Sequence, residues 1–430
     1  MYPPCRREAS SCGVVLSKEL DRNDASHLHG RSATLRVRFL AVNEAGALLE
    51  RFAPGLAEND AEALSAVAQA YILVLEQFPP SDFSSALRAA GAIIVETGDA
   101  TLIAATRAMF EQVPVVSAAE RGLRDELLEA IRLAENRPSV LHLRGRHIDL
   151  GDEAVIMGII NVTPDSFYDR VASIDGAVNK AKAMVSDGAK LIDVGGQSYA
   201  HWNPRVTAEE EKARVVSVVA AIAGAGIDAA ISVDTVRASV GTAVLDAGAH
   251  VINDCSGLSD PAVAEVVAAH GAGLVIMHIK GRLNERDPNA YRYNDVMAEI
   301  IEFLYQRTQR ALALGVAHDA IVVDPGLEFG KEPASDLEIL ERFGELRVLG
   351  YPILLAASRK SFMGRIFGRA AGQLLVPSLG AAALGIIAGA RLLRVHDVPE
   401  TVQLARMIAL TSPRLRRALS VPDQMPGTPA

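Results

Sequence analysis

The last two thirds of the sequence predict a (β/α)8 barrel of the TIM type, an α/β fold, preceded by a smaller N-terminal α/β domain. Three observations support the barrel. Short apolar runs recur eight times after residue 154, stretches of helix length separate them, and each run ends at a polar cluster. Short apolar runs that alternate with amphipathic helices indicate buried parallel strands with crossover helices. Eight such units in about 250 residues match the size of a closed barrel.

The eight apolar runs are the expected strands of the barrel. They are residues 155–160, 191–192, 230–233, 251–252, 274–277, 321–323, 353–357 and 392–393. The polar clusters that follow contain, in chain order, Asn161, Asp193, Asp234, Asn253, His278, Asp324, Ser358-Arg359-Lys360-Ser361 and Arg394-Val395-His396-Asp397. The active site of a TIM barrel lies at the carboxyl ends of its strands. We therefore expect these side chains to converge on one mouth.

Helix signals fall between the expected strands. Thr207-Ala208-Glu209-Glu210 fits a capping box, in which a threonine oxygen and a glutamate satisfy first-turn amides reciprocally. Four glycines each follow a helical run and precede a strand, as glycines that end helices do. They are Gly188, Gly248, Gly271 and Gly315. These connections belong to the bottom face of the barrel, which contributes to stability.

The first third of the chain predicts a smaller domain. Residues 1–33 are a polar segment that we expect to form a poorly ordered arm. Residues 34–137 alternate strand-like and helical stretches, as a small α/β domain does. The stretches are a β-like run 35–42, a helical 60–69, an apolar run 71–75, a helical 81–90, a strand-like 92–96 and two helical stretches up to residue 133. Lacking a glycine-rich phosphate loop, this unit is interpreted as a packing, oligomerisation or regulatory domain.

The junction between the two domains is expected at Arg137-Pro138-Ser139. The barrel domain is accordingly assigned to residues 138–415, with a flexible tail at 416–430. Residues 140–150 predict a hairpin that closes the bottom of the barrel.

Composition narrows the range of functions. The 50% hydrophobic content suits a compact α/β protein, and the net charge of −9 argues against a nucleic-acid binder. Cys5, Cys12 and Cys255 lack metal-like spacing. The most apolar stretches, residues 218–231 and 379–393, are interrupted and too short to span a bilayer. We expect a cytoplasmic protein that binds neither nucleic acid nor membrane.

Acidic and amide side chains at three strand ends indicate a site for a polar heterocycle. Asp234, Asn253 and Asp324 follow the third, fourth and sixth strands. An ionised aspartate at a buried strand end needs paired donors, and an amino-amidine edge supplies two parallel N–H groups. The alternative is that these residues cap loops. Asp193 either lines the pocket floor or holds the turn that follows it.

Basic side chains at the last two strands indicate an anion site. Ser358-Arg359-Lys360-Ser361 ends strand seven and opens a helix, where amides and cations act together. Arg394 and His396 alternate on strand eight and face the same side, although a solvated charge run is the alternative. Asn161 offers a hard oxygen ligand to Mg²⁺ bridging phosphates. His278 is either a site residue or a satisfied strand-end histidine.

The ordered motifs resemble those of the dihydropteroate synthases, the pterin-binding TIM barrels of folate synthesis. The opening signature is Met157-Gly158-Ile159-Ile160-Asn161-Val162-Thr163-Pro164-Asp165-Ser166-Phe167. The later motifs are Asp193-Val194-Gly195-Gly196, Ser232-Val233-Asp234-Thr235, Ile252-Asn253-Asp254, Asp324-Pro325-Gly326, Ser358-Arg359-Lys360-Ser361 and Arg394-Val395-His396-Asp397. They occur in the family's order across residues 155–407.

The resemblance implies a Mg²⁺-dependent transferase that joins 6-hydroxymethyl-7,8-dihydropterin diphosphate to 4-aminobenzoate, releasing pyrophosphate. It also implies a homodimer. The implied catalytic residues are Lys360, Asp324, Arg394 and His396. The implied substrate-binding residues are Asp193, Asp234, Asn253, Asp324, Lys360, Arg394, His396 and Met277, and the implied metal ligand is Asn161. Within these sets Asp234, Asn253, Asp324 and Lys360 hold the pterin, while Asn161, Arg394 and His396 take the pyrophosphate.

Three segments depart from the family pattern. Where the family continues Gly-Gly-Glu-Ser with Thr-Arg-Pro-Gly, this chain has Gln197-Ser198-Tyr199-Ala200-His201-Trp202-Asn203-Pro204, which replaces a threonine and an arginine of the aminobenzoate and pyrophosphate sites. Tyr168-Asp169-Arg170-Val171 replaces Ser-Asp-Gly-Gly, and Glu328 stands where a glycine is usual. The Phe-Tyr-Asp-Arg run and the altered loop also resemble some actinobacterial paralogues of the synthase.

Two alternatives to a synthase follow from these departures. One is a pterin-binding paralogue without synthase activity, with a regulatory or repurposed role. The other is a folate-linked methyltransferase, a class that usually works with a corrinoid partner, for which the sequence shows no docking signature.

Overall fold

The computed structural model describes residues 37–40, 71–75, 79, 81–96, 101–105, 107–135, 137–162, 173–199, 205–284 and 291–411. The chain divides into two compact units, and the division along the sequence falls after Arg137. The first unit also includes Tyr293–Tyr305 and Gly344–Gly350.

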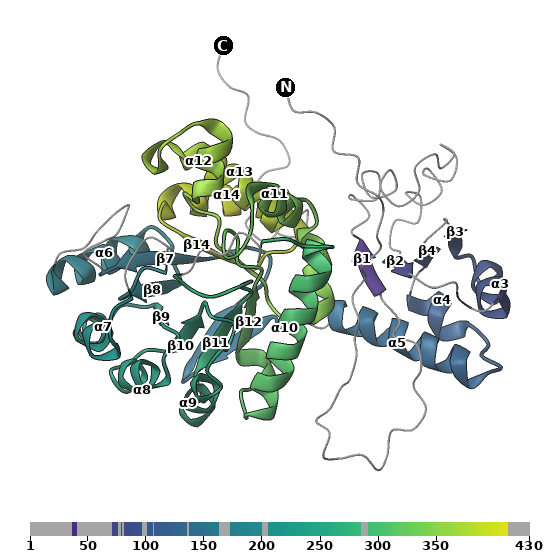
Figure 1. Ribbon diagram of the computed structural model, residues 1–430, viewed down its shortest axis with the longest axis horizontal. Helices are drawn as coiled ribbons and strands as arrows, with labels where there is room; N and C mark the ends of the chain where they lie inside the picture. Colours follow the sequence, from purple (N-terminus) through teal and green to yellow (C-terminus); the bar gives the residue numbers. More distant parts are fainter. Residues whose placement is uncertain are drawn as a thin grey trace, which may run out of the picture. The chain divides into compact units, whose positions relative to one another are not determined.

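The second unit is built on eight parallel strands, which confirms the predicted barrel (Figure 1). The strands are β7 (Val155–Asn161), β8 (Leu191–Gly195), β9 (Ala230–Asp234), β10 (Val251–Asp254), β11 (Gly273–Met277), β12 (Ile321–Asp324), β13 (Leu354–Leu355) and β14 (Leu392–Val395). Their order is β12-β11-β10-β9-β8-β7-β14-β13. A parallel bridge between Val323 and Ile353 joins the two ends of this sheet and closes the ring.

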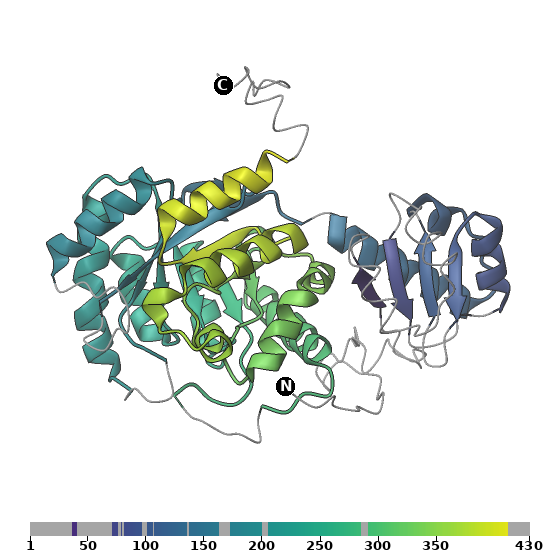
Figure 2. The same cartoon turned by 90° about the horizontal axis from the view of Figure 1, so that it is seen from above.

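At least one helix follows each strand in the sequence, as the predicted alternation requires, and helices lie outside the ring of strands (Figure 2). They are α6 (Ile174–Ser186), α7 (Ala208–Gly224), α8 (Ala238–Asp246), α9 (Ala262–His270), α10 (Val296–Ala313), α11 (Pro333–Glu341), α12 (Ser361–Phe367), α13 (Leu375–Ala388) and α14 (Val398–Ala409). Helix α7 begins with the predicted capping box between Thr207 and Glu210. The four predicted helix-ending glycines all have positive φ, from +58° to +113°.

Aliphatic side chains fill the lower part of the barrel. One buried residue or more from each strand contributes, for example Leu191, Val251 and Leu392. The predicted hairpin is present as β5 (Val140–Leu143) and β6 (Arg146–Asp149). Its buried side chains, including Leu141 and Leu143, belong to the same cluster. The hairpin therefore closes the barrel at the amino ends of the strands and removes that apolar layer from water.

The described part of the first unit contains a four-stranded antiparallel sheet in the order β1-β2-β4-β3. Its elements are β1 (Val37–Leu40), β2 (Tyr71–Leu75), α3 (Ser81–Ala89), β3 (Ile93–Glu96), β4 (Thr101–Ala105), α4 (Arg107–Gln112) and α5 (Ala118–Glu135). Strand β4 was not predicted from the sequence. The predicted helix 60–69 and the arm 1–33 lie outside the described residues, and so does the tail 416–430. Within the described ranges, every helix is too short or too polar to cross a bilayer.

Candidate active site at the mouth of the barrel

Strand alternation places the predicted polar residues directly above the aliphatic layer. Side chains two positions apart on a strand share one face. On four strands the lower residue is aliphatic and buried, and the residue two positions later is polar. These pairs are Leu191 with Asp193, Val251 with Asn253, Val322 with Asp324, and Leu392 with Arg394. The polar layer therefore lies inside the barrel, at the carboxyl ends of the strands.

A chain of charged and amide side chains links β8, β9, β10 and β14 across this layer. Arg394 Nε donates to Asp193 Oδ2 at 2.6 Å, and Arg394 Nη2 donates to Asp234 Oδ2 at 3.2 Å. Asn253 Nδ2 donates to Asp193 Oδ2 at 3.2 Å. The other carboxylate oxygens, Oδ1 of Asp193 and Oδ1 of Asp234, are buried and have no hydrogen-bond partner among the described residues. Two buried acceptors thus remain for donors supplied by a ligand.

Burial sets the ionisation of this layer. Burial raises the pKa of Asp234 to about 7, with a further rise from Asp193, and the nearby Arg394 opposes both effects. Burial alone would lower the pKa of Arg394, but its two carboxylate partners reverse the shift and raise it. Burial also raises the pKa of Asp324, against the N–H of Gly326 and the charge of Lys360. Arg394 therefore stays charged, and Asp234 titrates near neutral pH.

Asp324 and Lys360 approach the same layer from β12 and the start of α12. Asp324 Oδ1 accepts from the backbone N–H of Gly326 at 2.7 Å. Lys360 Nζ donates to the carbonyl of Leu327 at 3.3 Å and lies 4.7 Å from the centre of the Phe329 ring. The ammonium group is thus held over an aromatic face beside Asp324, where it can contact a ligand.

The carboxylate of Glu328 is turned toward the start of α12. Its backbone has φ +73°, the left-handed region in which glycine is usual. Its carboxylate accepts from the backbone N–H of Phe362 at 2.5 Å, in the first turn of α12, and lies 4.0 Å from Lys360. An anion near a helix N-terminus is favourable. The side chain therefore supports α12 and Lys360.

Lys331 was not predicted from the sequence as a residue of the site. It is buried, and its ammonium contacts Nδ1 of His278 at 2.9 Å and donates to the carbonyls of Gly326 and Phe329 at 2.7 and 3.0 Å. Burial, followed by the charge of Lys331, lowers the pKa of His278 well below its usual value. Of the two alternatives for His278, the structure favours the satisfied strand-end histidine. In the sequence, Lys331 stands seven residues after Asp324, and no other feature indicated a role for it.

Different residues of the Ser358-Arg359-Lys360-Ser361 run have different roles. Arg359 makes a two-pronged ion pair with Asp397 at 2.8 and 2.7 Å and also donates to the carbonyl of Ala371. Ser358 Oγ accepts from the backbone N–H of His396 at 3.2 Å. These contacts join the end of β13 to the end of β14. Arg359 and Ser358 thus position Lys360 and His396, and the Arg359 charge is already paired.

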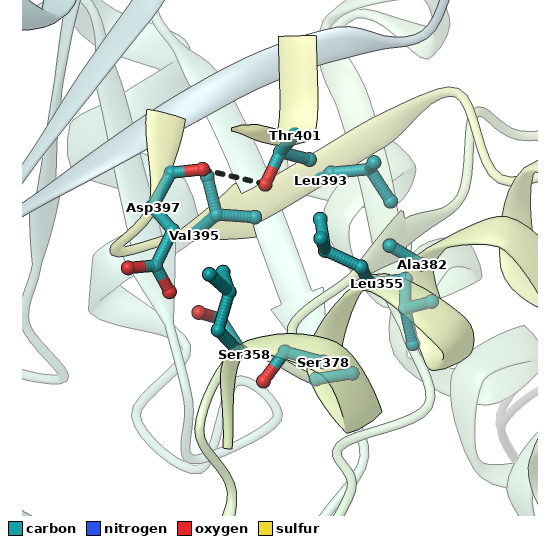
Figure 3. A pocket seen from close by; sticks show the side chains of 11 residues that line it. Leu355, Ser358, Ser378, Ala382, Leu393, Val395, Asp397 and Thr401 are labelled. Carbon is teal, nitrogen blue, oxygen red and sulfur yellow. Dashed lines mark hydrogen bonds between the residues drawn. The ribbon is translucent and has the colours of Figure 1, made fainter. Parts of the chain in front are cut away.

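The cavity in Figure 3 lies on the side of β13 and β14 that faces away from the barrel interior. Leu355, Leu393 and Val395, which line it, alternate with the residues that face the barrel interior. Its volume of about 10 Å³ is room for roughly one water molecule. A larger hollow of about 610 Å³ lies beside the β5–β6 hairpin, at the opposite end of the barrel from the polar layer.

The two altered loops are only partly described. Asn161 ends β7, and a side chain on Gly195 would place its Cβ 3.3 Å from Asn161 Oδ1. The glycine therefore leaves space beside this amide oxygen. Tyr199 is buried and packs with Cys255 and Met277. Residues 163–172 and 200–204 lie outside the described residues, so the predictions for Tyr168 to Val171 and for Ala200 to Pro204 are untested there.

The fold and this layer define the protein as a barrel enzyme with a buried acidic and amide pocket flanked by cations. Residues 157–396 match the family described as "Pterin binding enzyme", and the chain belongs to this family. Over 273 residues it is 37% identical to the dihydropteroate synthase of Escherichia coli, covering 63% of this chain and 96% of that protein. The crystal structure of the Yersinia pestis dihydropteroate synthase with a sulfonamide drug is 37% identical, with a TM-score of 0.61, and covers 63% of this chain and 98% of that one.

Two further relatives broaden the comparison. A Mycobacterium tuberculosis protein described as "Inactive dihydropteroate synthase 2" is 39% identical over 265 residues, which cover 60% of this chain and 83% of that protein. A Haloferax volcanii protein, "Probable bifunctional folylpolyglutamate synthase/dihydropteroate synthase", is 41% identical over 265 residues, which are 61% of this chain but only 31% of that protein. Relatives described as synthases and a relative described as inactive therefore both match this chain at 37–41% identity.

Proposed function

We propose that this protein is a dihydropteroate synthase, a transferase of folate biosynthesis. It would join 6-hydroxymethyl-7,8-dihydropterin diphosphate to 4-aminobenzoate and release pyrophosphate. The observation that carries the proposal is the partly buried chain Asp193–Arg394–Asp234, joined by Asn253, with two buried carboxylate oxygens left for a ligand's donors. An aminopyrimidinone edge is a planar donor edge of the required kind.

The pterin would lie across the polar layer. Its N–H groups would donate to Asp234 and Asp324, Asn253 would contact the same ring edge, and the ammonium of Lys360 would donate to a ring acceptor. Burial makes each of these hydrogen bonds count, because an unpaired buried polar group is costly. Met277, buried at the end of β11, would contact a face of the ring.

The diphosphate would lie toward β14 and β7. Arg394 and His396 would contact its oxygens, and the donor of Arg394 that pairs with neither aspartate is available for this contact. Asn161 would hold Mg²⁺, since one neutral oxygen beside the space at Gly195 suits an ion that keeps waters and takes phosphate oxygens. When bound, the ion would neutralise charge on the leaving diphosphate.

The reaction needs no nucleophilic side chain. The bond between the pterin methylene carbon and the diphosphate oxygen breaks, the amine nitrogen of 4-aminobenzoate bonds to that carbon, and the nitrogen loses a proton. Carbocation character at the methylene makes stabilisation of the leaving anion the main requirement. Arg394 and His396 would supply this stabilisation, and the pterin contacts would hold the methylene in line with the amine.

Product formation tests the proposal directly. Purified protein with Mg²⁺, the pterin diphosphate and 4-aminobenzoate should form dihydropteroate. Arg394→Lys, which cannot keep both aspartate contacts and reach the anion, should lower kcat by about 100-fold. Arg406→Lys, an exposed position on α14, is the matched control and should leave kcat unchanged. Wild-type protein that forms no product at high concentration would contradict the proposal.

A pterin-binding paralogue without synthase activity is the second candidate. One observation favours it: Tyr199 is buried against Met277. A relative described as inactive is also among the similar proteins, at 39% identity. The paired change Tyr199→Thr and Ala200→Arg restores the residue types usual in the family. If wild-type protein shows no detectable synthase activity and the double variant shows activity at least tenfold above the detection limit, the synthase function was lost through these positions. Continued inactivity with intact pterin binding would indicate a repurposed site.

A further inference from the structure

Tyr199 occupies the apolar side of the barrel mouth. It follows β8 by four residues and is only 8% exposed. Its side chain packs with Cys255 and Met277, and Val236, Ile279, Leu283 and Phe329 pack around this group. These residues come from the segments that follow β9 to β12. One aromatic side chain therefore reaches across the carboxyl ends of several strands.

The residues beneath Tyr199 belong to the inner face that also carries the polar layer. Met277 lies two residues after the buried core residue Val275 on β11, so it faces inward by strand alternation. Cys255, in the turn after β10, packs in the same cluster as Met277. Phe329 contacts this group and also the ammonium of Lys360. The ring of Tyr199 thus covers the surface on which a flat heterocycle held by Asp234 and Lys360 would rest.

The hydroxyl group of Tyr199 fits its surroundings less well than the ring does. Its oxygen is buried and has no hydrogen-bond partner among the described residues. Burial, with smaller effects from Cys255 and Asp234, raises the phenol pKa well above its usual value, so the group stays protonated. A buried hydroxyl without a partner is unfavourable. Packing of the ring therefore holds Tyr199 in place, and a ligand that offers better contacts can displace it.

The backbone before Tyr199 is anchored by a polar network. Gln197 Oε1 accepts from Arg237 at 3.0 Å, and Gln197 Nε2 donates to Asn284 at 3.3 Å. Asn284 in turn donates to the carbonyl of Ser198 at 3.1 Å. Arg237 also pairs with the buried Glu211. This network anchors the backbone from which Tyr199 extends.

We propose that Tyr199 is an internal occupant of the pterin pocket that sets its affinity: the phenol ring must leave the Cys255–Met277 surface before a planar fused heterocycle can bind. This inference rests on the proposed pterin site. When only a fraction of the protein has an open pocket, the apparent dissociation constant rises by the inverse of that fraction. An open fraction of about 1–10% therefore weakens binding about 10–100-fold.

The test compares binding of 6-hydroxymethylpterin to wild type, Tyr199→Ala, Tyr199→Thr and Tyr199→Phe by calorimetry. The two small variants should bind at least tenfold more tightly than wild type, because they leave the pocket open. Tyr199→Phe keeps the ring and removes the partnerless hydroxyl, so it should bind no more tightly than wild type. Two small variants guard against one that fails to fold, and thermal melting identifies the folded ones.

Alkylation of Cys255 gives a second readout that does not depend on affinity. Iodoacetamide modification, followed by peptide mass spectrometry, should be at least tenfold faster at Cys255 in Tyr199→Ala than in wild type. Saturating pterin should slow it again. Tyr199→Phe should react at the wild-type rate, because its ring still covers the thiol.

Several outcomes would overturn the inference. Weaker or unchanged binding in both small variants would show that Tyr199 contacts the ligand or has no effect on binding. If none of the four proteins binds 6-hydroxymethylpterin, the protein has no pterin pocket. A different result separates the two proposals. Tighter binding by the small variants, with no dihydropteroate formed by any protein, would support the internal occupant and reject the synthase.

Discussion

Asp234 is a site residue whose ionised form suits ligand binding but lowers the stability of the free protein. In the unfolded chain its carboxyl has an ordinary pKa of 3.8, and burial raises the folded value to about 7. Between these values the folded state holds the extra proton. Its contribution to the free energy of unfolding is therefore fully present below the lower value and is lost as the pH rises through about 7. The ionised form that suits a ligand's N–H groups is the form that costs the free protein stability.

Replacing this carboxylate should consequently stabilise the protein at high pH. We expect Asp234→Asn to melt at least about 2 °C higher than wild type at pH 8, with a smaller difference at pH 5. The variant should also lose pterin affinity. Melting curves at both values check the first expectation. Asp228→Asn, an exposed position before the same strand, is the control and should show no pH-dependent difference. A wild-type advantage that grows with pH would contradict this account.

The sequence predicted the positions of the site residues better than their contacts. Asp193, Asp234 and Arg394 could be placed at one mouth, because strand order and alternation fix where each side chain emerges. Their ion pairs join residues up to 201 positions apart, and no local pattern encodes such partners. Glu328 illustrates the limit. The sequence showed that Glu328 stands where the family usually has glycine. It did not show that the Glu328 carboxylate accepts a hydrogen bond from α12, at a residue 34 positions away.

At the scale of elements, the β5–β6 hairpin stabilises the barrel from the end opposite the site. Leu143 is buried in the lower aliphatic layer, and a Cβ on Gly273 at the start of β11 would overlap its side chain. The absence of a side chain at Gly273 thus gives the hairpin room to enter. The hairpin and the site are separated by the full length of the strands.

This packing predicts a non-additive pair of substitutions. Leu143→Ala should cost about 2–5 kcal/mol of unfolding free energy through cavity formation. Gly273→Ala should destabilise by forcing Leu143 aside. The double variant should be no less stable than Leu143→Ala alone, since the new methyl enters the vacated space. Denaturant titrations measure all three, and additive losses would reject the packing argument. The kcat of each folded variant should match wild type.

The elements differ in how clearly the sequence encodes them. All eight barrel strands were predicted, because buried parallel strands are continuous apolar runs and the helices between them end at glycines such as Gly188 and Gly248. Strand β4 was missed. Its residues, Thr101–Ala105, are mostly small or aliphatic and lie directly before helix α4, so periodicity alone did not distinguish strand from helix.

At the scale of the whole molecule, the strands of the barrel share a hydrophobic core with the β5–β6 hairpin. Its lower layer is sealed by the hairpin that follows Pro138, and the matching E. coli protein consists almost entirely of the equivalent region. We propose that residues 138–415 form an autonomous domain and that residues 34–137 serve packing, oligomerisation or regulation.

A shortened protein tests this organisation. A chain beginning at Pro138 should unfold in one cooperative transition, within about 5 °C of the barrel transition of the full chain. It should bind 6-hydroxymethylpterin with the same affinity if the first domain has no part in the site. Calorimetric melting and titration of both proteins measure this. Loss of the cooperative transition would show that the barrel depends on the preceding residues.

The stacking of a polar layer on an aliphatic one has a consequence for the history of such proteins. The lower layer and the hairpin stabilise the scaffold from the end opposite the rim. A duplicated copy can therefore accumulate changes such as Tyr199 and Glu328 without losing its shape. The barrel fold and the reaction that it catalyses can therefore be inherited separately. A descendant protein can keep the fold and acquire a different activity.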